Sequence, residues 1–508
     1  MAVTDFIVAI ELGSTRISGV AGKKNANGSI QILAYASEKS SDCIRKGVIF
    51  NLDKTTGRIQ QVINKLEDKL QVSIKKVYVG IGGQSVRSIH NQESKRLNED
   101  TRISQALIDD MMKNNKELPL VDQEIIAVEP QEYKIGNNQL TTEPVGISTD
   151  RIEGHFLNII ARNALRSNIR QCFRLAGEGY EIADCIVSAE ALANVVLTPS
   201  EKRSGCALID FGADTTTVSV YRNNILRHLA VIPLGGNNIT KDICSQQIDE
   251  IEAEQVKITF GSAYTAPSEN QDEANKQLSL DGKVSIRAHK LEDIVEARVE
   301  EILQNVLNQI VLSDYMDKLL AGAVLTGGGA NMANMEEAFK RITKIDKVRT
   351  ALEPNVELDD RDNLITHDGT QNTLVGLLAA GKENCCKDDP QRQKQLDLIN
   401  EMQKQQEEER KRLAALEEAR RKEEEKKKEK ANLEKCEALI IAARSHKNNK
   451  EWKAAEKKAN AALALGIKSK EDEIIALISD IKKARKENSI IGNFFKTLSD
   501  AADNIVKE

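Results

Sequence analysis

The sequence contains few aromatic residues and no pattern that marks a secreted or membrane-spanning protein. Phe, Trp and Tyr make up 3% of its 508 residues, and there is one Trp. No apolar run approaches the ~20 residues that a membrane-spanning helix needs. Residues 1–11 lack a basic region followed by an apolar run. We therefore predict neither a membrane-spanning helix nor a secretory signal.

Metal-binding cysteine patterns and an excess of positive charge are also lacking. The eight cysteines form no CxxC pattern, and Cys385 and Cys386, the one close pair, are adjacent, which disfavours a mutual disulfide. Free buried thiols are the prediction, and they suit a reducing cytoplasm. The formal net charge of −6 provides no overall basic field. We therefore expect no nucleic-acid partner.

Three glycine-rich segments, residues 8–15, 208–216 and 323–329, are the strongest signal present. In each of the first two, an apolar run reaches a carboxylate, Glu11 or Asp210. One apolar residue follows the carboxylate, and then come glycine and hydroxyl residues. This pattern is typical of a strand that enters a tight turn. Two such turns across a cleft would offer N–H groups and hydroxyls to phosphates, with the carboxylates holding hydrated Mg²⁺. The third turn has no side chains to keep backbone away from a purine or ribose.

The order of predicted elements indicates an α/β fold with two related halves. Strands and helices alternate along residues 6–83, which predicts a mixed sheet covered by helices. A second cycle begins at Gly205 with the same turn pattern, which predicts a repeat of the first half around a nucleotide cleft. Residues 84–164 read as an inserted α+β subdomain. The predicted strands are 6–10, 18–22, 76–81 and 225–232, and the predicted helices are 56–70, 104–117 and 371–383.

Changes in composition divide the chain into parts. The first half combines two segments around the insertion, and the second half does the same around a mostly helical segment. Three further parts follow the globular region. The predicted parts are 1–83 with 165–204, then 84–164, 205–236 with 321–386, 237–320, 391–435, 436–488 and 489–508.

Residues 391–435 form a highly charged segment without Gly, Pro or aromatic residues. Opposite charges recur four residues apart, as in Glu418 with Lys422 and Glu424 with Lys428, which stabilises a helix. Apolar residues are sparse after Leu416, although a coiled coil needs them at regular positions. A solvated single helix and a weak coiled coil both remain open.

Residues 436–488 regain an apolar helical face. We expect an antiparallel helix pair and a third helix over 471–484, in an arrangement that resembles one tetratricopeptide-like unit. The apolar positions of the predicted pair are Leu439, Ala443, Trp452, Ala455, Ala459 and Leu463.

Residues 489–508 predict an amphipathic helix whose apolar face either enters a membrane interface or packs on the preceding helices. Its own charges are not net basic, so attraction to an anionic membrane must come from basic residues at 482–486. The membrane-facing residues that we predict are Ile490, Ile491, Phe494, Phe495, Leu498 and Ile505.

The three turns, in this order, resemble the phosphate 1, phosphate 2 and adenosine motifs of the actin and Hsp70 ATPase superfamily. Within it, the chain most resembles the FtsA family of actin-like bacterial cell-division proteins. The resemblance covers about residues 5–386 and the terminal helix, whereas 391–488 have no counterpart in the better-known members. Its most specific segments are 45–49, 128–133 (Val-Glu-Pro-Gln-Glu-Tyr), 144–146, 375–378 and 381–383.

The resemblance implies an ATP site with Mg²⁺ held through water by Glu11 and Asp210, and Glu190 orienting the attacking water. Where the superfamily usually has Asp-x-Gly-Gly-Gly-Thr, this chain has Ala213 and Asp214. The Asp214 charge would oppose a phosphate unless it points away or joins the metal shell, so we expect ATP binding with weak or absent hydrolysis. The implied nucleotide-binding residues are Gly13, Ser14, Thr15, Asp210, Gly212, Thr215, Thr216, Gly235, Gly236, Glu254, Lys257, Gly327, Gly328, Gly329 and Asn331.

The same resemblance implies an adaptor in cell division. It would self-associate, capture the C-terminal tail of the tubulin-like protein FtsZ near Arg298 in the helical subdomain 2B (237–320), and attach to the cytoplasmic face of the membrane at the division septum. The insert, called 1C, would contact copies of the chain or other division proteins, while subdomains 1A and 2A hold the nucleotide. The alternatives are a pilus-assembly adaptor, or a kinase or chaperone ATPase of the same fold.

Overall fold

A computed structural model describes residues 6–386, except 137, 178–179, 267–275 and 281–283, and residues 390–505. Within these, the side chains of 99–100, 284, 390–408, 414, 417, 425 and 489–505 lie outside the description. The chain divides into two compact units, residues 1–388 and 389–508. Each unit is described by itself below.

The first half of the N-terminal unit is built on a six-stranded mixed sheet. Its order is β11-β6-β1-β2-β3-β19, with β1 antiparallel to β2 and parallel to β6. Apolar side chains fill its centre, and β1 has Ile7, Val8, Ala9 and Ile10 buried. Its strands are β1 (Ile7–Leu12), β2 (Arg16–Lys24), β3 (Ile30–Lys39), β6 (Lys76–Ile81), β11 (Glu181–Val187) and β19 (Leu358–Asp359), and a separate ribbon pairs β4 (Ile44–Arg45) with β5 (Val48–Ile49).

The second half repeats this arrangement, as the recurring turn pattern predicts. Its strands follow the order β18-β17-β12-β13-β14, with β12 antiparallel to β13 and parallel to β17. The predicted strand 225–232 is confirmed as β14. These strands are β12 (Cys206–Phe211), β13 (Thr216–Arg222), β14 (Ile225–Ile232), β17 (Gly322–Thr326) and β18 (Val348–Thr350), and a separate ribbon pairs β15 (Gln277–Leu280) with β16 (Val284–Arg287).

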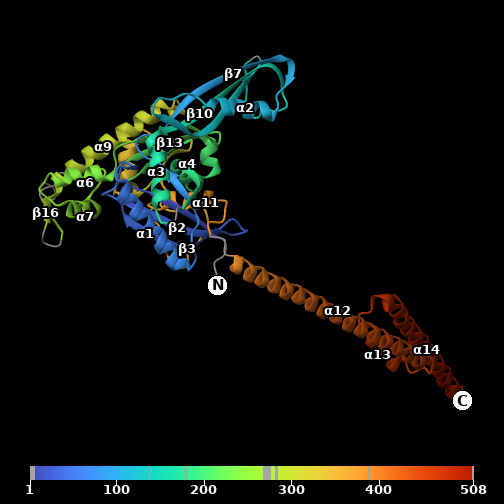
Figure 1. Cartoon of the computed structure of the whole chain (residues 1–508). Helices are drawn as coiled ribbons and strands as arrows, with labels where there is room; N and C mark the ends of the chain where they lie inside the picture. The colour runs from blue at the N-terminus through green and yellow to red at the C-terminus, as the bar shows by residue number, and fades with distance from the viewer. Residues whose placement is uncertain are drawn as a thin grey trace. The chain divides into compact units, whose positions relative to one another are not determined.

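The strands between the two halves extend the second sheet to nine. β7 meets β14 at Ala230↔Arg87, and the sheet continues through β10, β8 and β9. Helix α2 packs on this part, and Figure 1 shows β7, β10 and α2 projecting together from the N-terminal unit. The elements are β7 (Arg87–Arg102), α2 (Gln105–Lys116), β8 (Gln123–Ile135), β9 (Gln139–Thr141) and β10 (Ser148–Arg162).

The helices of the N-terminal unit bury one apolar face each. In α1, Ile59, Val62, Ile63 and Leu66 recur at helical spacing and are fully buried, while Asn51 caps its first turn. The helices are α1 (Leu52–Leu70), α3 (Asn163–Leu175), α4 (Ser188–Val196), α5 (Pro199–Ser204), α6 (Gly236–Cys244), α7 (Glu250–Phe260), α9 (Ala288–Leu312), α10 (Met335–Thr343) and α11 (Asn372–Ala380), with 3-10 turns η1 (Met316–Lys318) and η2 (Gly328–Asn331).

The C-terminal unit contains α12 (Pro390–Asn448), α13 (Trp452–Leu463), the turn η3 (Lys468–Lys470) and α14 (Glu471–Ile505). The end of α12, α13 and α14 share a small core. Its fully or nearly buried members include Ala443, Ala455 and Ala459 of the predicted helix pair. Trp452 instead lines a surface cavity with Arg485.

The structure corrects three predicted boundaries. The helix predicted over 371–383 ends at Ala380, where glycine follows. No element ends at the predicted boundary between 435 and 436, because α12 runs through it as one helix of 59 residues. Likewise, α14 continues without a break from the predicted third helix into the predicted amphipathic helix. In each of the last two cases the backbone has no Pro to stop the helix.

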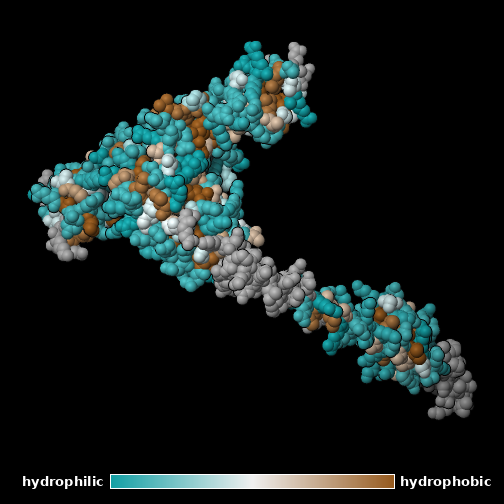
Figure 2. Space-filling model, in the orientation of Figure 1, coloured by the Kyte–Doolittle hydropathy of each residue, from teal (hydrophilic) through white to brown (hydrophobic). Residues whose placement is uncertain are grey.

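Exposed ion pairs run along α12. Lys422 pairs with Glu418 at 2.7 Å, as predicted, whereas Glu424 pairs with Arg420 at 3.8 Å. The space-filling view shows mostly hydrophilic residues on the visible face of both units, with hydrophobic residues scattered (Figure 2). Among the described residues, no helix is both long enough and apolar enough to cross a bilayer.

Candidate functional site

The turn after β1 is closed by its own backbone. The Gly13 N–H donates to the Arg16 carbonyl at 3.0 Å, and a Cβ on Gly13 would stand 2.7 Å from that oxygen. Only glycine fits there without displacing the turn. The next residue, Ser14, accepts a hydrogen bond at its Oγ from the Gly47 N–H at 3.0 Å.

The turn after β12 repeats this geometry. The Gly212 N–H donates to the Thr215 carbonyl at 2.9 Å, and a Cβ on Gly212 would lie 2.8 Å from that oxygen. The first turn of α6 lies against it, because the Gly236 N–H donates to the Gly212 carbonyl at 3.0 Å. A helix N-terminus offers free N–H groups and a positive dipole end to a phosphate.

The third turn packs directly on the second. Gly327 has φ +83°, and a Cβ there would lie 2.3 Å from Asp210 Oδ1 and 2.7 Å from the Phe211 carbonyl. Gly329 lies against the Phe211 side chain, because a Cβ added at Gly329 would stand 2.8 Å from Phe211 Cβ. Asn331 donates to the Gly328 and Asp368 carbonyls at 3.3 and 2.7 Å. Glycine is required here because a Cβ would collide with the Asp210 side chain, the Phe211 carbonyl or the Phe211 side chain.

Asp214 joins the two halves across the site. Its Oδ2 accepts from the Lys46 N–H at 2.9 Å, and its Oδ1 accepts from the Asn237 side chain at 2.8 Å. Lys46 belongs to the short segment that also donates to Ser14. The Asp214 carboxylate is thus hydrogen-bonded at both oxygens, by donors from both halves, which holds its side chain in place.

Two carboxylates face each other at the carboxyl ends of β1 and β12. Burial, with the neighbouring Asp210 charge, raises the pKa of Glu11 to about 8. Burial also raises the pKa of Asp210 to about 6. Both side chains keep some access to solvent but are enclosed by protein on most sides. A cation between them would relieve the repulsion.

These two residues fit a hydrated Mg²⁺ better than a metal held wholly by protein. In the described part of the chain, no cluster of three or more His, Cys, Asp or Glu could hold a metal ion. Mg²⁺ commonly keeps several waters and takes one or two carboxylates with substrate phosphates. Glu11 and Asp210 supply such a pair beside the glycine turns.

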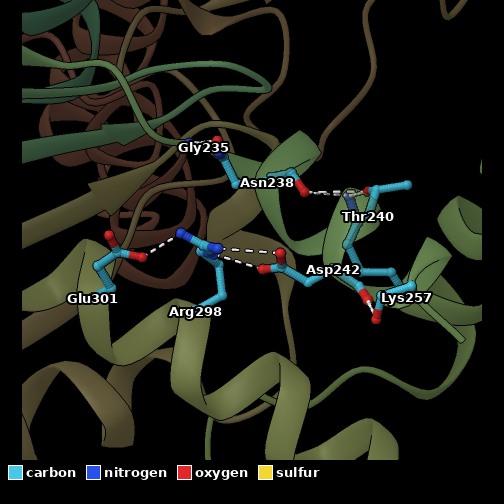
Figure 3. Close-up of polar contacts among 9 residues, drawn as sticks. Gly235, Asn238, Thr240, Asp242, Lys257, Arg298 and Glu301 are labelled. Atoms are coloured by element: carbon cyan, nitrogen blue, oxygen red, sulfur yellow. Dashed lines mark hydrogen bonds and ion pairs between the residues drawn. The ribbon is translucent and has the colours of Figure 1, made fainter.

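Lys257 and Glu254 of α7 meet α6 beside the second turn. Lys257 Nζ donates to the Gly236 carbonyl at 3.2 Å, to Thr240 Oγ1 at 3.0 Å and to Glu254 Oε2 at 2.7 Å. Figure 3 shows Lys257 and Thr240 on these neighbouring helices. The lysine side chain is only 10% exposed. The predicted pair therefore lies next to Gly236, with the Lys257 charge balanced by Glu254.

Arg298 is already engaged within the protein. Its Nε and Nη2 donate to Asp242 at 2.6 and 3.1 Å, and Nη1 donates to Glu301 (Figure 3). Asp242 belongs to α6 and Arg298 to α9. One end of α6 therefore contacts the phosphate-side turn and the other end contacts the residue predicted to bind a partner.

Glu190 lies near the start of α4, where its Oε1 atom is buried without a hydrogen-bond partner in the described residues. Burial, and then the adjacent Glu129 carboxyl, raises the pKa of Glu190 to about 8. Its charge also acts on Tyr221, which lies five residues along β13 from Thr216. Among the described residues, the groups that act on Glu190 are Glu129 and Lys202, so its role in orienting water stays a prediction.

The raised pKa of Glu190 predicts a pH-dependent stability. The folded chain holds this proton more tightly than the unfolded chain, whose carboxyl pKa is 4.5. Its stabilising contribution is therefore complete below that value and is lost as pH rises through about 8. We expect Glu190→Gln to flatten this loss and to exceed the wild type at pH 8 by about 2 kcal/mol.

Urea unfolding between pH 5 and 8.5 measures this difference, with the exposed Glu117→Gln as the matched control. Parallel stability curves for wild type and Glu190→Gln would contradict the assignment. The same variant tests the catalytic prediction, because a water-orienting role requires slower ATP hydrolysis at unchanged ATP affinity.

Two contact networks were missed by sequence reasoning. One is the hydrogen bond between Asp214 and the Lys46 N–H. The only signal for it in the sequence was the pair Lys46-Gly47, which forms a turn with positive φ at both residues. The other explains the Pro-Gln-Glu-Tyr segment. Arg227, 4% exposed, donates to both Glu132 oxygens at 2.6 and 2.8 Å, and Gln131 donates to the Leu226 carbonyl at 3.0 Å. These hydrogen bonds join β8 to β14.

Two related halves, with three glycine turns converging between them, define an actin-like ATPase fold. A solved structure, the PilM-PilN type IV pilus biogenesis complex, aligns with 74% of this chain and 99% of that chain, at a TM-score of 0.52 and 14% identity. That level of identity shows the shared fold alone.

The family models "Cell division protein FtsA" and "SHS2 domain inserted in FTSA" match residues 207–367 and 83–160. Cell division protein FtsA of Porphyromonas gingivalis is 29% identical over 387 residues, covering 74% of this chain and 78% of the relative. That of Pseudomonas aeruginosa is 28% identical over 380 residues, covering 74% and 89%. The chain belongs to the FtsA family of cell-division proteins, which confirms the resemblance seen in its motifs.

Proposed function

We propose that the N-terminal unit binds ATP with Mg²⁺ between its halves. The observation that supports this most is the convergence of the three turns: Ser14 and Asp214 meet through residues 46 and 47, and Gly327 packs on Asp210. Glu11 and Asp210 offer carboxylate oxygens whose ionised forms a cation would favour, and Lys257, paired with Glu254, places an ammonium group near Gly236. Both signs are needed for a nucleotide with its metal.

In this proposal, bound ATP stabilises the arrangement of the two halves and is hydrolysed slowly or not at all. Asp214, which stands where the superfamily usually has a glycine, is hydrogen-bonded to Lys46 and Asn237 and so joins the two halves. Glu190, the water-orienting candidate, lies beside Glu129 and has a pKa raised to about 8, which favours its neutral form. ATP binding with slow or absent hydrolysis follows from these two features.

In the proposed role, the chain self-associates and tethers FtsZ filaments to the cytoplasmic face of the membrane at the division site. Arg298 on α9 would contribute to capture of the FtsZ C-terminal tail. Because Asp242 links Arg298 to α6, the capture surface and the phosphate-side turn share one helix. The insert formed by β7–β10 and α2 would contact other copies or other division proteins. The terminal part of α14 would attach to anionic lipid.

Co-sedimentation of the full chain with FtsZ and anionic vesicles, with and without Mg-ATP, tests this role. We expect FtsZ to pellet with vesicles only when the chain is present. Arg298→Ala should weaken FtsZ capture about tenfold, a usual effect for a central arginine at an interface. Arg58→Ala is the matched control, because it breaks the ion pair that Arg58 on α1 makes with Glu38 on β3.

Retained ATP binding by Arg298→Ala would show that loss of its contact with Asp242 has not disrupted α6. FtsZ pelleting that is equal for wild type and Arg298→Ala would contradict the assigned capture surface. Failure of wild type to pellet FtsZ at all would contradict the adaptor role, and phosphoryl transfer to a sugar would support the kinase alternative.

A further inference from the structure

A cavity of about 440 Å³ opens on the N-terminal unit, away from the three glycine turns. It lies between α3 and the first residues of β8. Its size is in the range that holds small ligands. Its lining includes Arg166, Ser167, Arg170, Gln171 and Arg174 of α3 and Glu124 of β8.

The three arginines of this cavity share one face of α3. They are spaced four residues apart, which separates neighbours by about 6 Å along the helix axis. Arg166 lies 3.5 Å from Glu124, its one carboxylate partner in the cavity. In the described part of the chain, Arg170 and Arg174 make no hydrogen bond or ion pair. Arg170 and Arg174 are exposed, so water screens this row of like charges, and a bound anion would add the counter-charge that the row lacks.

Within the described part of the chain, Arg166 also lacks a hydrogen-bond acceptor for one of its N–H groups. Its Nε is buried and has no hydrogen-bond acceptor among the described residues. The Cys185 thiol lies beside this guanidinium, but a thiol is a weak acceptor. A buried guanidinium N–H without an acceptor costs free energy that a ligand oxygen would recover.

We propose that this cavity binds a phosphate monoester. Three guanidiniums and one carboxylate leave two positive charges in the lining, which match the charge of about −2 of a phosphate monoester at neutral pH. A phosphate group presents three acceptor oxygens, and Ser167 and Gln171 add neutral donors to the guanidiniums. A single carboxylate would neutralise only half of this charge. The guanidinium geometry suits paired hydrogen bonds to phosphate oxygens.

Isothermal titration of the full chain with phenyl phosphate, phenyl sulfate and benzoate tests the ligand class. The three probes share a ring and differ in their charged group. We expect phenyl phosphate to bind most tightly, and the pair Arg170→Gln, Arg174→Gln to weaken it about tenfold or more. Arg170→Lys keeps the charge but loses the paired geometry, so an intermediate loss is expected. Arg412→Gln, an exposed helical arginine on α12, is the matched control.

Unchanged phenyl phosphate binding in the double variant, with an unchanged melting temperature, would overturn the proposal. Equal binding of all three probes would overturn it as well, since charge would then not decide affinity. Flotation with vesicles of phosphatidic acid, with Phe494→Glu and Phe495→Glu present in both the reference chain and the arginine double variant to remove attachment through α14, distinguishes the source of the ester. Loss of flotation in the double variant alone would identify a lipid headgroup, whereas unchanged flotation would identify a soluble ester. Neither result depends on ATP binding.

Discussion

Asp210→Asn is expected to lower the affinity for Mg-ATP by about ten- to a hundredfold, the usual effect of removing a group that orients metal-bound water. The amide keeps the size of the carboxylate, so the close contact with Gly327 is preserved. What changes is the charge that faces Glu11. The nucleotide-free variant should therefore melt at a higher temperature than wild type at neutral pH, because the neutral amide avoids the cost of burying the charged Asp210 carboxylate.

Titration with a fluorescent ATP analogue, with Mg²⁺ and with a chelator, measures this effect. The variant should resemble wild type in the chelator and differ from it in Mg²⁺. Asp359→Asn, a surface residue paired with Arg361, controls for the loss of one charge. If wild type and Asp210→Asn respond equally to Mg²⁺, Asp210 does not face the metal and the proposed site is wrong.

Phe494→Glu combined with Phe495→Glu is expected to abolish vesicle binding. Burial of a Phe side chain contributes ~1.5–3 kcal/mol, so replacing both removes much of the proposed attachment and adds charge repulsion with anionic lipid. The backbone at these positions is helical as part of α14, while their side chains lie outside the described part of the chain. Flotation with anionic vesicles gives the measurement.

Asn493→Glu combined with Lys496→Gln makes the same change in charge at positions that the helical period places away from the apolar face. This control should retain much of the binding. Equal loss in both double variants would mean that charge alone sets the attachment. Full binding by the Phe494→Glu, Phe495→Glu variant would contradict membrane attachment through this helix and favour packing on the preceding helices.

Local patterns predicted the turns well because their requirements are local. Gly13 and Gly212 are needed within four residues of chain, where a Cβ would strike a carbonyl of the same turn. The repeat of strand order in the two halves also follows from the repeated pattern of Gly and carboxylate. Helix ends were harder to predict, since α12 and α14 continue past changes in hydropathy that contain no proline, and α14 also continues through Gly492.

Residues distant in sequence explain what was missed. Asp214 and Lys46 are 168 residues apart, and Arg227 and Glu132 are 95 apart. Nothing in the local composition of either segment indicates its partner. The same holds for the arginine-lined cavity, because the spacing of Arg166, Arg170 and Arg174 is common on solvated helices, and only the placement of β8 encloses it.

The sequence by itself determined the α/β class, the repeat, the three glycine turns and the FtsA family, because glycine, carboxylates and apolar periodicity act through nearby backbone. Only the tertiary structure decided that Asp214 joins the two halves, that Arg298 is bound to Asp242, and that Glu190 meets Glu129. Those outcomes depend on which chain segments meet in space. Charge and burial act between such neighbours regardless of their separation along the chain.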